Sequence, residues 1–374
     1  MFKNILLALG LSVCISLPIF GANTTGHVLG NFEDTKVYSL KNSDGGSISG
    51  TSEGAFKDPK SIVHLSDGSF WITEEDNHRI QHFSKVGSYL GKVGAVNGYM
   101  APISGTGNYE FNSPHMIASD SNDNIYVTEA AQIKKYTSDG TYIATIINEL
   151  FVDIWGIAVD SSNNIWIVDN DLHHIFKIDQ NGIVLNTIGY ESSGEYFLGS
   201  ADSQFNSPID IEIDSDGSLW IADKTNKRVQ HFNSDGEFIS KINLRGLVLG
   251  IAVDSTSVWV TFDDIYQVYK YNKSTLELEG IFHGSYYDDI YDIDIVDDII
   301  WLVNSNDNQI IRAVRNGTKE FTKVLNYGKL NEENTFIYTS EDANGFYSPS
   351  SIVLDGDNNI WVKNLYSIKK YDQS

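Results

Sequence analysis

Short apolar runs alternate with polar turns along almost the whole chain, and one arrangement of them recurs. The runs are four to six residues long, and the turns are rich in Asp, Asn, Ser and Gly. Runs of this length between such turns are typical of β-strands, and no segment has the periodicity of an amphipathic helix of useful length. An apolar–aromatic–apolar triplet recurs seven times, at residues 70–72, 125–127, 165–167, 219–221, 258–260, 300–302 and 360–362.

Every triplet stands in the same order of predicted strands. An apolar run, often led by Pro, comes before it, and a third run and a less regular fourth run follow, as in PIDIEID, LWIAD, RVQHF and EFISKI. Three to four strands in about 40 residues are the signature of a propeller blade. A β-sandwich would not repeat one register seven times. We therefore predict an all-β fold, a β-propeller of four-stranded blades, with seven blades.

The two ends of the repeat region complement each other. The last copy ends after its third run, because only three residues follow Tyr371. The run at 36–40 precedes the first copy and has no blade of its own. We therefore expect this N-terminal strand to complete the last blade, because ring closure removes exposed sheet edges. The predicted organisation is a signal peptide at 1–22, an N-terminal segment at 23–35 and a propeller at 36–374.

Three of the copies, at 56–90, 111–146 and 205–242, closely resemble NHL repeats. The resemblance covers about residues 36–374 and is looser in copies five and six, where the leading Pro is missing. It implies a β-propeller, in agreement with the strand pattern. NHL propellers usually have six blades, so six is the alternative to the count of seven.

The chain also distantly resembles peptidyl-hydroxyglycine amidating lyases, which are propellers of this repeat type. Those enzymes hold a catalytic zinc with three His, each just after a leading Pro, and such a site needs three neutral imidazoles. Only His115 matches here. The equivalent positions in the other copies carry Lys60, Trp155, Ile209, Leu249, Tyr291 and Ser350. The zinc site and the lyase activity are therefore not carried over, and we expect no metal and no cofactor.

The innermost strand of each blade starts at the mouth of the central channel, where propellers commonly bind ligands. Polar and aromatic residues stand at or just after this start in several copies. The candidate ligand-binding residues are Lys60, His115, Trp155, Asp210, Tyr291 and Asp292. The alternative is that these residues only line a solvent-filled channel and bind no ligand.

A polar residue follows most triplets. These residues are Glu74, Glu129, Asp169, Asp223, Asn304 and Asn364. A ring of carboxylates could bind a metal or a cationic ligand. Arg79 and Arg228 follow two of them within a few residues, which favours local structural ion pairs instead.

Several linkers between copies are long and carry aromatic residues. They are Tyr99, Tyr109, Tyr196, Phe197, Phe336 and Tyr338. Such rings would suit sugar stacking or peptide contact on the mouth face, because flat aromatic surfaces bind at a low entropic cost. The alternative is that the long linkers pack on themselves.

The formal net charge is −24, and the basic residues are scattered, which argues against a nucleic-acid partner. The first 22 residues have the basic start, apolar stretch and small-residue cut of a secretory signal, so we predict a periplasmic or secreted protein without a membrane span. The lone cysteine, Cys14, lies in this segment and leaves no disulfide after cleavage. Lipidation at Cys14 is the less favoured reading, because Val13 stands where a small residue is wanted.

These observations favour a noncatalytic, exported, monomeric propeller that recognises a protein, a peptide or a carbohydrate on its loop-rich face. The alternative is an enzyme of the lyase or lactonase type at the channel mouth. In that case His115 would be a base or a metal ligand.

Overall fold

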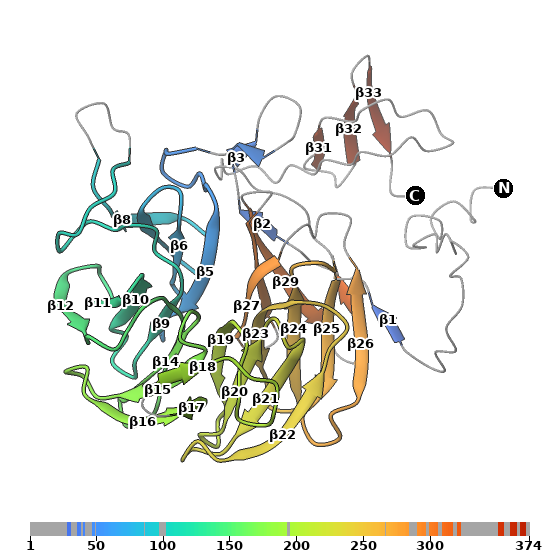
Figure 1. The fold of residues 1–374 in the computed structure, drawn as a ribbon. Coiled ribbons are helices and arrows are strands. Elements are labelled where there is room, and N and C mark those ends of the chain that lie inside the picture. The colour runs from blue at the N-terminus through green and yellow to red at the C-terminus, as the bar shows by residue number, and fades with distance from the viewer. Residues whose placement is uncertain are drawn as a thin grey trace.

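The computed structural model is a ring of small sheets around a central axis (Figure 1). It describes residues 50–85, 87–96, 102–192, 195–265, 267–283, 290–296, 299–305, 309–316 and 320–322, and strands at 28–30, 36–38, 40–41, 47–48, 351–354, 360–364 and 367–371. Six of the sheets are blades, and the first strand of each blade lies innermost. The predicted all-β propeller with four-stranded blades is confirmed.

The blades follow one another in chain order. The first contains β5 (Pro59–His64), β6 (Phe70–Glu74), β7 (Arg79–Phe83) and β8 (Tyr89–Val93). The second contains β9 (Ile117–Ser119), β10 (Ile125–Glu129), β11 (Gln132–Tyr136) and β12 (Tyr142–Ile147). The third contains β13 (Ile154–Val159), β14 (Ile165–Asp169), β15 (His174–Ile178) and β16 (Val184–Ile188).

The second half of the ring has the same plan. The fourth blade contains β19 (Pro208–Ile213), β20 (Leu219–Asp223), β21 (Arg228–Phe232) and β22 (Phe238–Asn243). The fifth contains β23 (Val248–Val253), β24 (Ser257–Phe262), β25 (Gln267–Asn272) and β26 (Leu278–His283). The sixth contains β27 (Ile290–Val296), β28 (Ile299–Asn304), β29 (Gln309–Asn316) and the N-terminal β2 (Lys36–Tyr38).

The aromatic triplets lie in the second strand of their blades, and these strands are almost wholly buried. In β20, Trp220 lies opposite His231 of β21, and the two rings stack with centroids 3.9 Å apart. The apolar residues on either side of the aromatic residue pack against an adjacent blade. Leu219 of the fourth blade, for example, packs in one cluster with Trp166 of the third. The core therefore lies between blades, which explains why the triplet recurs.

The ring closes where β27 of the sixth blade lies beside β5 of the first. The backbone N–H of Ile62 donates to Asp292 Oδ2 over 3.1 Å, and His64 Nδ1 lies 2.6 Å from Asp294 Oδ2. The described residues thus form a ring of six blades, the alternative count, and the count of seven stays a prediction for the whole chain.

The seventh triplet lies in a separate sheet. This sheet consists of β31 (Ser351–Leu354), β32 (Ile360–Asn364) and β33 (Ser367–Tyr371). The predicted closure by an N-terminal strand is present, but on the sixth blade, because β2 pairs antiparallel with β29. In addition, β1 (Val28–Gly30) pairs parallel to β26, which the sequence pattern did not indicate.

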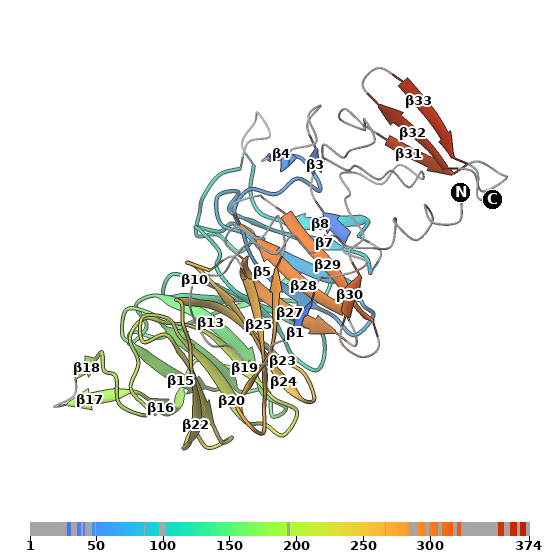
Figure 2. The ribbon, with the colours of Figure 1, turned by 90° about the vertical axis from the view of Figure 1, so that its right-hand side faces the viewer.

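Three small elements complete the fold. They are the pair β3 (Leu40–Lys41) and β4 (Ser47–Ile48), the pair β17 (Tyr190–Ser192) and β18 (Glu195–Phe197), and β30 (Glu320–Thr322) beside β29. The β17–β18 hairpin projects from the ring (Figure 2). The predicted signal peptide with Cys14, and also Tyr99, Phe336, Tyr338 and Ser350, lie outside the described residues. Within the described part of the chain, no helix has the length and apolar character needed to span a membrane.

Candidate functional site at the channel mouth

Four of the six predicted ligand-binding residues meet at the channel mouth. The ring of His115 stacks on Trp155 with centroids 4.4 Å apart, and Trp155 stacks on Tyr291 at 6.1 Å. Lys60 Nζ lies 4.1 Å from the centroid of the Tyr291 ring. The four side chains come from the first, second, third and sixth blades. We call Lys60, His115, Trp155 and Tyr291 the mouth platform.

The repeat register explains why these side chains converge. Each stands at the same position of its repeat, at or next to the start of the innermost strand. The two remaining blades carry Ile209 and Leu249 at this position, and both are buried. The mouth is therefore apolar toward the fourth and fifth blades and aromatic on the other side.

His115 is held by its neighbours rather than directed into solvent. Its side chain is buried, and Nδ1 lies 3.3 Å from the carbonyl oxygen of Ile154. Its own carbonyl oxygen accepts a hydrogen bond from the Thr73 hydroxyl over 2.6 Å. Trp155 and Tyr291 are only partly buried. The two aromatic rings of the platform are thus more exposed than its imidazole.

Lys60 is fixed by two carboxylates of its own blade. Its ammonium group lies 2.9 Å from Asp58 Oδ1 and 3.2 Å from Glu75 Oε2, and its side chain is only 11% exposed. The same ammonium group lies over the Tyr291 ring, which is a cation–π arrangement. The mouth therefore already contains one desolvated cation that belongs to the chain.

Further carboxylates surround the platform from the third and fifth blades. Asp153 accepts a hydrogen bond from Trp155 Nε1 over 2.7 Å, and Asp263 pairs with Lys224 at 2.8 Å. Burial raises the pKa of Tyr291 well above its ordinary value, and four nearby carboxylates raise it further. We call these four residues, Asp58, Glu75, Asp153 and Asp263, the acidic rim.

Asp210 and Asp292, the other two predicted residues, lie one position further along their strands and bind backbone of a neighbouring blade. Asp210 Oδ2 accepts the N–H of Ile251 over 2.8 Å, and Asp292 Oδ2 accepts that of Ile62 over 3.1 Å. Ser61, at the same position in the first blade, accepts an N–H of the second blade over 3.3 Å. These side chains join inner strands and do not form part of the mouth platform.

Next to the residues that join the inner strands, a small cavity is lined by both acidic and apolar side chains. Its polar lining consists of Ser61, Asp210, Glu212, Asp292 and Asp294. Burial raises the pKa of Asp210 to about 7, and burial together with the charge of Asp210 raises the pKa of Glu212 and of Asp292 well above the ordinary values. Sequence reasoning missed Glu212 and Asp294. The signal was the acidic residues at alternate positions of PIDIEID and YDIDI, because alternate residues share one face of a strand.

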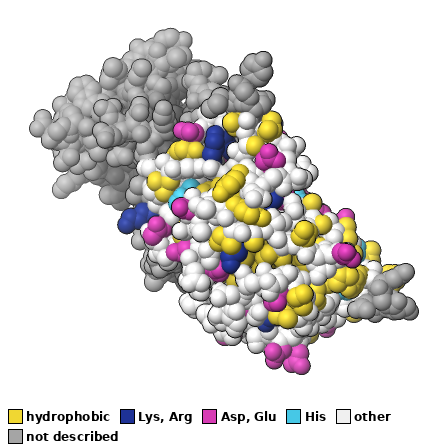
Figure 3. Space-filling view, turned by 90° about the vertical axis from the view of Figure 1, so that its left-hand side faces the viewer, with side chains coloured by type: hydrophobic (Ala, Val, Ile, Leu, Met, Phe, Trp, Pro, Cys, Tyr) yellow, Lys and Arg dark blue, Asp and Glu magenta, His cyan; other side chains and the backbone are white. Residues whose placement is uncertain are grey.

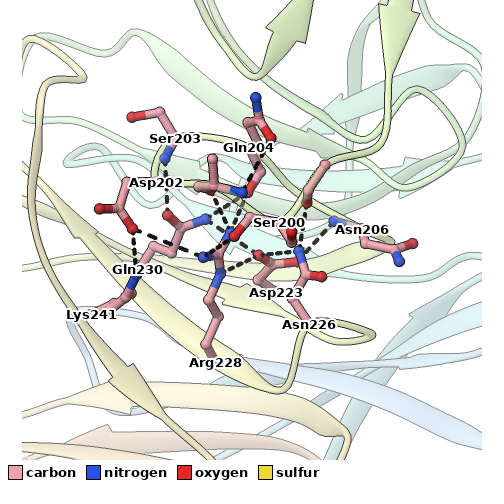
Figure 4. Close-up of polar contacts among 12 residues, drawn as sticks. Ser200, Asp202, Ser203, Gln204, Asn206, Asp223, Asn226, Arg228, Gln230 and Lys241 are labelled. Atoms are coloured by element: carbon pink, nitrogen blue, oxygen red, sulfur yellow. Dashed lines mark hydrogen bonds and ion pairs between the residues drawn. The ribbon is translucent and has the colours of Figure 1, made fainter.

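The carboxylates that follow the triplets hold the long linkers. In the fourth blade, Arg228 Nε donates to Asp223 over 2.7 Å, and its terminal nitrogens donate to linker carbonyl oxygens (Figure 4). Those carbonyls belong to Ser200, Ala201 and Gln204. Arg79 and Glu74 form the same arrangement in the first blade at 2.6 Å. The expectation of local ion pairs is thus confirmed for both Arg residues.

Two variations of this arrangement were not predicted. In the second blade, Lys134 takes the place of Arg and lies 2.9 Å from Glu129. In the third blade, Asp169 accepts backbone hydrogen bonds from Val152 and Leu172, and burial raises its pKa. Asn304 is buried, and the Asn364 side chain lies outside the described residues. In the described ranges, no group of three or more His, Cys, Asp or Glu is arranged to hold a metal ion.

The described linker aromatics are partly packed and partly exposed. Tyr109 is half exposed and lies 6.4 Å from the ring of Tyr136. Tyr196 packs against His174 at 4.5 Å, whereas Phe197 is 40% exposed. Exposed apolar residues also recur at the second position of four outer strands. They are Leu90, Ile143, Leu185 and Ile239. Figure 3 shows apolar side chains interspersed with polar ones on the side of the ring that lies to the left in Figure 1.

Comparison with known proteins finds similarities in sequence and in fold. Residues 205–232, which end with β21, match the family model of the NHL repeat. The protein is a β-propeller with an NHL repeat. The human NHL repeat-containing protein 3 is 28% identical over 210 residues, which cover 50% of this chain and 58% of the human protein. The NHL-repeat propeller thus spans little more than half the length of this relative.

Two further similarities concern enzymes. The rat peptidylglycine alpha-amidating monooxygenase is 29% identical over 95 residues, which cover 23% of this chain and 9% of the rat protein. A catalytically inactive virginiamycin B lyase from Staphylococcus aureus, solved with quinupristin, superposes on the NHL-repeat propeller with a TM-score of 0.53. Its sequence identity is 16%, over 90% of this chain and 98% of that chain. At this identity the likeness establishes the fold alone.

Proposed function

We propose that the propeller is an exported, noncatalytic binding protein that contacts a peptide segment of a partner with its mouth platform. One observation carries this proposal. The partly exposed rings of Trp155 and Tyr291 lie stacked in the middle of the mouth face, and buried His115 and Lys60 support them. Rigid aromatic surface of this kind contributes contact area while little side-chain entropy is lost.

The contacts of His115 support a binding role over the alternative of a lyase or lactonase. A general base or zinc ligand at the mouth would have to present an imidazole nitrogen to substrate or metal. In the mouth platform, the His115 ring lies against Trp155, and its Nδ1 faces a backbone carbonyl. Its burial and its stacking on Trp155 fit a supporting role, whereas the Nδ1 contact alone would also suit a His that acts through Nε2.

A binding screen with paired variants tests the proposal. The chain from residue 23 onward would be applied to peptide and glycan arrays, and its ligands titrated with the Trp155→Ala and Leu185→Ser variants. Leu185 is an exposed outer-strand residue of the same blade as Trp155 and serves as the control. We expect peptide ligands whose affinity falls at least about tenfold in Trp155→Ala, the size typical of an aromatic anchor, and stays constant in Leu185→Ser.

Other outcomes would contradict the proposal. Ligands that bind equally well to Trp155→Ala would place the interaction elsewhere on the molecule. A set of glycan ligands sensitive to Trp155→Ala would assign the mouth to carbohydrate. Stoichiometric zinc in the purified protein that is lost in His115→Ala would favour the enzyme.

A further inference from the structure

The mouth platform already holds one ammonium group, that of Lys60, beside an aromatic ring and two carboxylates. Lys60 places its ammonium 4.1 Å from the Tyr291 centroid and within 3.2 Å of carboxylates of Asp58 and Glu75. The side chain is nearly buried, so the cation has lost most of its water and is stabilised by the aromatic face and the two carboxylates. This half of the mouth is occupied by the chain itself.

The other half has the same chemistry without a buried cation. Trp155 lies beside Tyr291 and is partly exposed, and Asp153 accepts its indole N–H over 2.7 Å. In the described part of the chain, Asp153 has no Lys, Arg or His within ion-pair distance. Asp263 pairs with Lys224, but both side chains are well exposed, at 40% and 25%, so solvent weakens this pair.

The charges near the platform do not balance. The acidic rim contributes four carboxylates, and Lys60 and Lys224 contribute two positive charges, which leaves a formal charge of −2 among these six groups. The whole chain carries −24. A negative surface attracts cations and repels anionic ligands such as acidic glycans or phosphate groups.

We infer that the mouth binds the ammonium or guanidinium group of a Lys or Arg side chain from a basic peptide, beside Asp153 and against the partly exposed Trp155. This inference rests on the proposed binding function and names the ligand class. The incoming cation would pair with Asp153 next to Trp155, as Lys60 pairs with Asp58 next to Tyr291. The acidic rim would then be nearer to neutral, and a peptide with one basic residue among small ones would fit.

Titration calorimetry with a defined probe tests the inference. The probe is an acetylated, amidated hexapeptide with two lysines among glycines, and its control is the same peptide with both lysines Nε-acetylated. We expect the unmodified peptide to bind at least tenfold more tightly and to weaken with added salt. Asp153→Asn, which keeps an acceptor for the Trp155 indole, should weaken binding at least fivefold. Asp235→Asn, at an exposed turn of the fourth blade, should change it less than twofold.

A second variant makes the test independent of Asp153. Lys60→Met removes the internal cation beside Asp58, Glu75 and Tyr291, so the lysine peptide should bind more tightly, by at least threefold. Equal affinity for the acetylated and unmodified peptides, or equal losses in Asp153→Asn and Asp235→Asn, would overturn the inference. If the array screen yields neutral or acidic peptides that depend on Trp155, the binding function stands and only the ligand class fails.

Discussion

The backbone N–H of Ile62 donates to the carboxylate of Asp292 across the seam between the first and sixth blades, over 3.1 Å. The two residues are 230 positions apart in the chain. The same seam brings Lys60 to the ring of Tyr291, so the closure of the ring and the assembly of the mouth platform are one structural event. A change that loosens this seam should therefore affect both stability and binding.

The buried carboxyls that line the small cavity predict a stability that falls as the pH rises. Burial raises the pKa of Asp210 to about 7, so between its ordinary value and pH 7 the folded state binds more protons than the unfolded state. The stabilising contribution is complete at low pH and is lost as the pH rises through 7. From pH 5 to pH 8, the free energy of unfolding should fall by at most about 1.4 kcal/mol per pH unit for each such carboxyl.

Urea unfolding at several pH values checks this dependence. The Asp210→Asn variant should have a flatter profile than the wild type, because its amide does not titrate. Asp160, whose pKa is lowered, affects stability only near and below pH 4 and lies outside this window. An Asp210→Asn profile as steep as that of the wild type would show that Asp210 does not have a raised pKa, and this comparison cancels the opposing contributions of His82 and His231, whose pKa values burial lowers.

Close approach of inner strands predicts a penalty for a side chain at Gly250. A Cβ there would lie 2.8 Å from the Cα of Asp292 and 3.0 Å from the carbonyl oxygen of Tyr291. Both atoms belong to backbone that cannot move without disturbing the sixth blade. Gly250→Ala should therefore destabilise the fold by about 1–3 kcal/mol, the typical cost of overpacking.

Gly91 offers a matched control for this substitution. It lies in the outer strand β8, and a Cβ there would meet no atom within 4 Å. Gly91→Ala should leave the thermal midpoint nearly unchanged. Equal midpoints for the Gly250→Ala and Gly91→Ala variants would mean that the inner strands are less closely packed than described.

Arg228 joins Asp223 to the linker before the fourth blade, so Arg228→Ala should strongly destabilise the fold. Asp223 is fully buried and would lose its cation, and three linker carbonyls would lose their donor. Removing one partner of a buried ion pair typically costs about 3 kcal/mol or more. Urea unfolding should show this loss, and limited proteolysis should cut residues 198–207 faster.

Lys241→Ala is the control variant for Arg228→Ala. It pairs with Asp202 at 2.6 Å, but both side chains are exposed by more than a third, and such surface pairs contribute less than about 1 kcal/mol. Lys241→Ala should therefore behave almost as the wild type in both assays. A similar loss in the two variants would indicate that the linker is not held mainly by Arg228.

The repeat register predicted much of this fold from sequence. The seven triplets all lie in second strands of a sheet or in the equivalent strand β32, and the equivalence of positions brought Lys60, His115, Trp155 and Tyr291 to one place. The blade count was not predictable in the same way. A repeat pattern specifies how each blade forms, whereas the closure depends on which inner strands pack side by side, here β27 and β5.

The roles of Asp210 and Asp292 show a second limit. Both were expected at the mouth because they follow the start of an inner strand. The pairing of their strands shifts register just before each of them, between Pro208 and Asp210 and between Ile290 and Asp292. Similar shifts occur in β5 and β13, and successive residues of a strand point to opposite faces, so side chains one position beyond the platform positions are directed elsewhere. The acidic rim was missed because its members come from turns and linkers of three separate blades.

The contact between His64 and Asp294 permits the most direct test of the six-bladed ring on which the mouth platform depends. The two side chains lie 2.6 Å apart across the closing seam. A double-mutant cycle with His64→Ala and Asp294→Ala, measured by urea unfolding, should give a coupling energy of about 1–3 kcal/mol, because the two residues are in direct contact. If the two substitutions are additive within about 0.5 kcal/mol, the first and sixth blades are not neighbours, and the mouth platform is not formed as described.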